Sequence, residues 1–83
     1  MMTAAQMRAA RALLRIDQKT LAELAGLSVP TIQRMESSDG DVRGVVDSLI
    51  RVVTALENAG IELIGEGSVS QTGGRGVRLK PPS

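Results

Sequence analysis

The chain has 83 residues and a formal net charge of +1, and it contains no Cys, His, Phe, Tyr or Trp. The length fits a single domain. Without Cys and His the chain lacks disulfides, the usual metal ligands, and the commonest nucleophile and general base of enzymes. Without aromatic residues it also lacks the stacking surfaces with which proteins bind single-stranded nucleic acids. We therefore expect no enzymatic activity, no metal and no cofactor. Neither a signal sequence nor a long apolar run is found, which predicts a cytoplasmic protein that does not enter a membrane.

The first predicted helix covers about residues 3–15. Thr3 and Gln6 have the spacing of a capping box, in which each side chain bonds to the backbone of the other residue. Met2 and Met7 stand on either side of this box, where apolar residues often pack together and fix the start of a helix. Apolar residues then recur at helical spacing toward the end of this range.

Two shorter helices are predicted next. Asp17 is a typical N-cap residue for a helix over 18–25, and Gly26 supplies the left-handed conformation that commonly ends a helix. Ser28 is in turn the expected N-cap of a helix over 29–36. Two short helices joined by a turn of three or four residues have the arrangement of a helix-turn-helix.

Residues 37–44 are rich in Ser, Asp and Gly and predict a surface loop. A longer fourth helix is expected from Val45 or Asp47 to Ala59, with Gly60 as its stop. The apolar residues of this helix cover more of its circumference than one buried face needs, which indicates a second surface to bury.

Residues 61–83 change character, because apolar and polar residues alternate near 61–66 and again near 76–80. This period of two predicts two short strands. The Gly-rich segment 65–76 connects them and lacks the sequence patterns of phosphate-binding loops. The expected fold is therefore mainly α, with four to five helices and a short C-terminal β-hairpin or, if the strands pair between chains, a dimeric β-sheet.

Residues 17–36 meet the packing demands of a helix-turn-helix. Ala22 is small where the third helix crosses the second, Gly26 opens the turn, and Leu27 points inward to lock it. The pattern reads Gln18-x-x-Leu21-Ala22-x-x-Ala25-Gly26-Leu27-Ser28-x-x-Thr31-Ile32-x-x-Met35-Glu36.

This pattern resembles the Xre, or Cro/cI-type, helix-turn-helix family of bacterial and phage transcription regulators. The resemblance covers roughly residues 4–59 and is densest over 17–36. It implies a Cro/cI-like DNA-binding domain over residues 1–60, followed by a dimerisation tail over 61–83. It also implies a sequence-specific transcriptional regulator, by default a repressor. Such a protein binds an inverted-repeat DNA duplex as a homodimer, with the helix over 29–36 in the major groove.

The resemblance further implies roles for individual residues. Base contacts fall on Val29, Pro30, Gln33 and Arg34. Phosphate contacts fall on Gln18, Lys19, Ser28, Thr31 and Arg43, although Lys19 and Arg43 are equally consistent with ordinary surface charges. Because the first two base-contact residues are apolar, hydrogen-bonded readout is left to Gln33 and Arg34. Arg11 and Glu36 occupy the positions of a structural ion pair in this family.

The apolar surplus of the fourth helix and the short strands predict an obligate homodimer. The residues expected at its interface are Val45, Val52, Ile61, Leu63, Val77 and Leu79, with Glu62 near Arg78 on the outer face of a four-stranded sheet. The sequence leaves open whether the strands pair within one chain or between chains. The alternative function is an antitoxin-type interaction protein that binds a toxin and its own promoter. RNA polymerase is a further candidate partner, if the protein is an activator.

Overall fold

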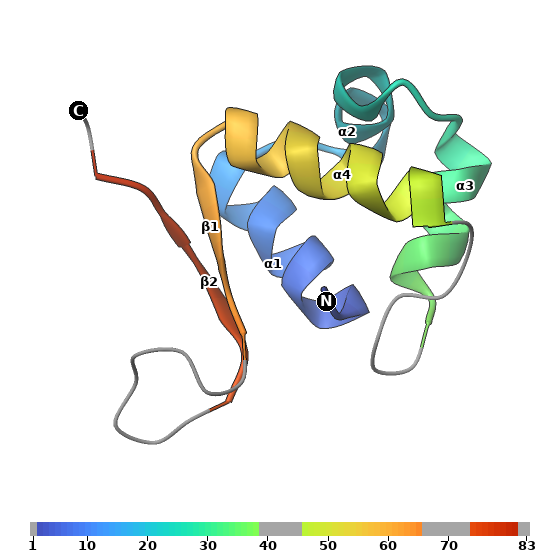
Figure 1. The fold of residues 1–83 in the computed structure, drawn as a ribbon. Helices are drawn as coiled ribbons and strands as arrows, with labels where there is room; N and C mark the ends of the chain where they lie inside the picture. Colours follow the sequence, from blue (N-terminus) through green and yellow to red (C-terminus); the bar gives the residue numbers. More distant parts are fainter. Residues whose placement is uncertain (1, 39–45, 66–73, 82–83) are drawn as a thin grey trace.

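The computed structural model describes residues 2–38, 46–65 and 74–81. Within these ranges the chain forms four helices, α1 (Ala4–Leu14), α2 (Gln18–Ala25), α3 (Val29–Glu36) and α4 (Val46–Asn58), followed by the strands β1 (Ile61–Ile64) and β2 (Gly76–Leu79). The result is a compact, mainly helical domain with a C-terminal antiparallel hairpin (Figure 1). The hairpin and α3 lie on opposite sides of the helical body. None of the helices in these ranges is long and apolar enough to cross a membrane.

The predicted N-caps are confirmed. Thr3 Oγ1 accepts a hydrogen bond from the Gln6 backbone N–H at 3.0 Å, and Gln6 Oε1 accepts one from the Thr3 backbone N–H at 2.8 Å. Asp17 Oδ1 accepts from the Thr20 backbone N–H at 2.8 Å, and Ser28 Oγ accepts from that of Thr31 at 3.3 Å. Each side chain therefore satisfies a backbone donor that the first helical turn leaves unpaired.

Two helices stop at the expected glycines, although α4 ends at Asn58, one residue before the expected Ala59. Gly26 has φ +68° and Gly60 has φ +104°. A Cβ atom on Gly26 would lie 3.3 Å from Nη1 of Arg51, the end of an exposed and flexible side chain, so this position favours glycine for its conformation rather than for space. The expected end of the first helix at residue 15 is one residue too long, because Arg15 leaves the helix with φ +58°.

The core is aliphatic and includes residues from all four helices and from β1. The largest fully buried side chains are Met2, Met7, Leu21, Ile32, Val52, Leu56 and Ile61. Met2 and Met7 pack into this core, as their positions on either side of the capping box predict. Because Ile61 belongs to the same cluster, the hairpin shares the core of the helices.

Burial corrects two of the expected dimer contacts. Val52 and Ile61 are 0% exposed within the single chain, so neither has surface left for a second subunit. The apolar surplus of α4 lies instead at Val46 and Ile50, which are 64% and 52% exposed. Val45 lies outside the described residues.

The remaining expected dimer residues lie on the hairpin. Leu63 and Val77 are half-buried against the core, whereas Leu79 is 51% exposed. Within the described residues β1 pairs with β2 of its own chain, in a register that places Glu62 opposite Arg78. These two side chains, which were expected to lie near each other, form an ion pair with an Nε–Oε2 distance of 2.8 Å.

Gln6 attaches the hairpin to α1. Its Nε2 donates to the backbone oxygens of Ile64 at 3.0 Å and of Gly76 at 2.9 Å, which are cross-strand partners. The side-chain amide of Gln6 thus holds both strands while its oxygen completes the capping box. Sequence analysis identifies only the capping role, because the contacts to the hairpin join residues far apart in the sequence.

The left-handed conformation of Arg15 gives a testable prediction. A residue with a Cβ atom adopts this conformation at a cost of about 1–2 kcal/mol, which glycine avoids. We therefore expect Arg15→Gly to be more stable than Arg15→Ala by about 1 kcal/mol after allowing for the greater unfolded-state entropy of glycine. Urea denaturation of the two variants measures this difference, and equal midpoints would contradict the assignment.

Candidate nucleic-acid interface

The turn between α2 and α3 is built from short-range contacts. The backbone N–H of Leu27 donates to the carbonyl of Ala22 at 2.9 Å, which closes the turn after Gly26. Leu27 is half-buried against the core, and Ala22 and Ile32 are buried beneath the crossing of the two helices. Ala22, Leu27 and Ile32 are therefore buried or half-buried, as the sequence predicts for these positions.

The outward face of α3 carries polar groups that can bind a base edge. Pro30, Gln33 and Arg34 are exposed, while Ile32 and Met35 on the opposite face are buried. Gln33 and Arg34 together offer an amide and a guanidinium group, the side chains that bond best to the edges of adenine and guanine.

The other residues expected at this end of α3 are more constrained. Val29 is half-buried against the core, so it keeps only part of its side chain for an apolar contact. Ser28 is exposed and Thr31 half-buried, and their hydroxyl oxygens lie 2.9 Å apart within hydrogen-bond distance. The N-cap thus orders the groups that surround the first turn of α3.

The N-terminus of α2 carries Gln18 and Lys19, of which Lys19 is exposed and Gln18 half-buried. A helix N-terminus carries a partial positive charge that favours anions. Asp17 caps this end, and the hydrogen bond from the backbone N–H of Thr20 holds the pKa of its carboxyl below the ordinary value. Arg43, the remaining expected phosphate contact, lies outside the described residues.

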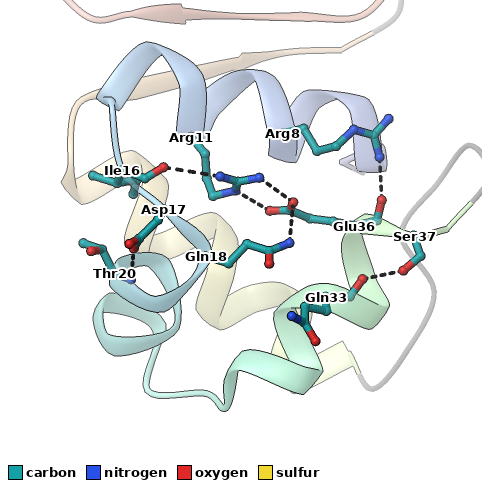
Figure 2. A network of polar contacts seen from close by, with 9 residues as sticks. All are labelled: Arg8, Arg11, Ile16, Asp17, Gln18, Thr20, Gln33, Glu36 and Ser37. Atoms are coloured by element: carbon teal, nitrogen blue, oxygen red, sulfur yellow. Dashed lines mark hydrogen bonds and ion pairs between the residues drawn. The ribbon is translucent and has the colours of Figure 1, made fainter.

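One buried carboxylate joins the three N-terminal helices. Glu36, at the end of α3, accepts hydrogen bonds from Arg11 on α1, with Nε–Oε2 and Nη2–Oε1 distances of 2.6 and 2.8 Å (Figure 2). Its Oε1 also accepts from Nε2 of Gln18 on α2 at 3.1 Å. The ion pair that the resemblance implies is therefore present in this geometry, and the structure adds Gln18 to it.

Arg8 makes a further contact with the end of α3 that sequence analysis does not identify. Its guanidinium group donates to the backbone carbonyl of Glu36, which the last turn of α3 leaves without a helical partner (Figure 2). A cation at a helix C-terminus also interacts favourably with the helix dipole. No sequence pattern indicates this bond, because 28 residues separate its partners.

The Glu36 carboxyl is kept charged by its partners. Burial acts to raise its pKa, but the hydrogen bonds from Arg11 and Gln18 and the nearby positive charges outweigh burial and hold the pKa below its ordinary value. The hydrogen bond to Glu36 also raises the pKa of Arg11. The pair is therefore ionised at neutral pH.

Comparison with known proteins adds no assignment. The sequence matches no protein-family model and no curated protein. Within the described ranges, no group of three or more Asp and Glu side chains is placed to hold a metal ion. The candidate site therefore consists of the outward face of α3, the start of α2 and the network around Glu36.

Removing Arg11 and removing Glu36 should change the free energy of unfolding by different amounts. The side chain of Glu36 is 4% exposed, whereas that of Arg11 is 21% exposed and can turn toward water more easily. Removing one partner of a buried ion pair costs about 3–5 kcal/mol, because a charge is left without compensation. We expect Arg11→Met to approach this loss, Glu36→Leu to cost less, and the double variant to be more stable than Arg11→Met. Urea denaturation of the three variants checks this order, and equal stability of Arg11→Met and wild type would contradict it.

The lowered pKa of Glu36 also predicts a dependence on acid. Above its ordinary value of 4.5 this carboxyl is charged in both the folded and the unfolded chain, so its contribution to stability is fully present. As the pH falls below this value, the unfolded chain binds a proton more readily than the folded chain, and stability is lost until the folded pKa is passed. We expect Glu36→Gln to lose less stability than wild type over this acid range. Denaturation midpoints at a series of pH values test the difference, and parallel pH profiles would argue against it.

Proposed function

We propose that the protein is a sequence-specific DNA-binding transcriptional regulator of the Xre, or Cro/cI, type. It binds an inverted-repeat DNA duplex as a homodimer and places α3 in the major groove of each half-site. The single observation that carries the proposal is the capped helix-turn-helix, in which Gln33 and Arg34 are exposed on α3 while its opposite face is buried in the core.

Base readout and positioning fall to different residues. Arg34 pairs with guanine and Gln33 with adenine, while Pro30 and the exposed part of Val29 contact thymine methyl groups. Lys19, Ser28, Thr31 and Arg43 bind phosphates and fix the register of the protein on the duplex. The chemistry of these side chains and the exposed face of α3 support this division.

Gln18 serves both the fold and the DNA. Its side-chain amide has two N–H groups. One donates to Glu36, and the other is free to donate to a phosphate oxygen near the N-terminus of α2. Glu36 therefore orients the group that binds the phosphate, and Arg11 neutralises the carboxylate that would otherwise repel it.

Repression by blocking access to a promoter is the regulatory mode that we propose. Two copies of the domain would bind half-sites whose centres lie about one helical turn, or about 10 bp, apart. The protein would act on DNA in the bacterial cytoplasm.

The exposed apolar residues of α4 favour a second candidate function. Val46 and Ile50 are uncovered in the single chain and could bind another protein, as in an antitoxin that binds both a toxin and its own promoter. Copurification of a stoichiometric toxin that is released by Ile50→Arg would support this alternative over a regulator that acts alone. An activator that touches RNA polymerase is the remaining variant of the proposed function.

Substitution of Arg34 tests the proposed docking. We expect Arg34→Ala to weaken operator binding by about 1–3 kcal/mol per half-site and to relax base choice at one position, because it removes a bidentate contact to guanine. Arg34→Lys is the matched control that keeps the positive charge but replaces the planar guanidinium fork with a flexible ammonium group. It should lose specificity while the dependence of affinity on salt stays near that of wild type. Gel shifts on the operator and on random DNA measure the ratio, and an unchanged ratio in both variants would show that α3 does not read bases through Arg34.

Substitution of Lys19 should produce the opposite pattern. A phosphate contact is blind to sequence, so Lys19→Ala should weaken binding to operator and random DNA alike and reduce the slope of log K against log salt by about one unit. Lys19→Arg is the control, because it keeps a positive charge at the same position and should therefore keep the salt slope of wild type. A normal salt slope for Lys19→Ala would leave Lys19 an ordinary surface charge.

A further inference from the structure

We infer that Arg8 is a positioning residue for base readout. Its guanidinium group fixes the last turn of α3 to α1, and thereby sets the angle at which Gln33 and Arg34 meet a DNA duplex, without itself contacting the DNA. The inference deepens the proposed function and rests on it, because base readout by α3 is part of that proposal. The attachment of α3 to α1 is also tested in the free protein, so the two can fail separately.

The first argument is the origin of the hydrogen-bond donors at the end of α3. The last carbonyls of a helix lack partners within it. The carbonyl of Gln33 accepts from the backbone N–H of Ser37 at 3.0 Å, a local bond that moves with the helix end. The carbonyl of Glu36 accepts instead from Arg8, which belongs to α1 (Figure 2). This bond therefore ties the backbone of α3 to another element.

The second argument is that Arg8 adds a constraint that the buried ion pair does not supply. Arg11 binds the side-chain carboxylate of Glu36. A carboxylate at the end of rotatable bonds can stay in place while the backbone that carries it tilts. Arg8 binds the carbonyl of the same residue, which is part of the helix backbone. The two contacts together limit both the position and the tilt of the last turn of α3.

The third argument is the arrangement of the two cations. Arg8 and Arg11 stand three residues apart on α1, where side chains are neighbours and like charges repel. Figure 2 shows both side chains directed from α1 toward the end of α3. The carboxylate of Glu36 and the negative end of the helix dipole compensate the repulsion. The end of α3 thus supplies the negative charge that makes this pair of cations favourable.

The fourth argument is the closeness of this contact to the residues proposed to read bases. Gln33 and Arg34 lie within one helical turn of Glu36, and both are exposed. A binding site of this kind must be held within about 0.5 Å and 10–20° of its productive geometry. A larger tilt of the last turn would misplace both side chains at once. The contact from α1 therefore affects specificity more than general affinity for DNA.

The exposure of Arg8 allows a test in a folded protein. If its guanidinium group is removed, water can bond to the freed carbonyl, whereas removal of Arg11 leaves a buried charge. We therefore expect Arg8→Met to fold with a melting temperature near that of wild type. Arg15, at the C-cap of α1, is also exposed, so Arg15→Met is the matched control that removes one positive charge at the other end of the helix.

Gel shifts on the operator and on random DNA, over a series of salt concentrations, measure the effect on readout. We expect Arg8→Met to lower the ratio of the two affinities by about tenfold, because a tilted α3 loses part of its base contacts in both half-sites. Its affinity for random DNA and its salt slope should match those of Arg15→Met. Arg8→Lys should recover part of the ratio, because an ammonium group can also donate to the last carbonyls of a helix.

Hydrogen exchange tests the attachment of α3 without DNA. Loss of the contact from Arg8 should speed exchange of the backbone amides in the last turn of α3, because this end then opens locally at a lower free energy. The same amides in Arg15→Met should exchange at the wild-type rate.

The outcomes separate this inference from the proposed function. An unchanged affinity ratio in Arg8→Met would overturn the inference, as would an equal loss on both DNAs with a flatter salt slope, which would make Arg8 a phosphate contact. A ratio that falls only together with the melting temperature, with no recovery in Arg8→Lys, would also overturn it, as would unchanged exchange in the free protein. A wild-type protein that binds no specific DNA would remove the proposed function, while exchange would still decide whether Arg8 fixes α3.

Discussion

The structure depends on the burial of one charge, the carboxylate of Glu36. A buried carboxylate is strongly unfavourable unless it is paired and hydrogen-bonded. Arg11 on α1 and Gln18 on α2 supply those bonds, so the carboxylate fixes two helices relative to the third. The eight-residue α3 is too short to be stable as an isolated helix in water. Its orientation is therefore set by this network and by the core beneath it.

The same network leaves one end of α3 fixed and its outward face free. Glu36 holds the C-terminal end through its side chain, and Arg8 holds it through its carbonyl. Gln33 and Arg34, one turn or less away, remain exposed. The DNA-binding role proposed for α3 needs this combination, because base contacts demand a defined position while the side chains that make them must stay uncommitted.

Local signals in the sequence were sufficient to predict the four helices. The three N-caps and the stops at Gly26 and Gly60 depend on residues within a few positions of each other, and all are confirmed. Arg15 was misplaced because nothing in its residue type indicates a left-handed conformation. The contacts of Gln6 and Arg8 were missed for a different reason, since they join segments whose meeting is set by tertiary packing.

The expected dimer contacts show which features of the structure the spacing of apolar residues can predict and which it cannot. Apolar residues surround most of α4, so their spacing fixes their angles relative to each other but not which angle faces the core. Val52 was assigned to a partner and is buried, whereas Ile50 is exposed. The strand residues were placed better, because alternation correctly put Ile61 and Leu79 on one face. Their different exposures depend on how far the helices extend over the sheet, which alternation does not encode.

These contacts together make α1 the element that connects the hairpin to α3. Gln6 at its start holds both strands of the hairpin, and Arg8 and Arg11 on another side of the helix hold the end of α3. With Ile61 in the shared core, the hairpin is fixed to the helices and cannot act as an independent tail. In the proposed homodimer, the separation of the two copies of α3 would then be set by this packed body. Under the proposed function, the spacing of the half-sites would therefore depend on side-chain contacts that touch neither the DNA nor the second copy.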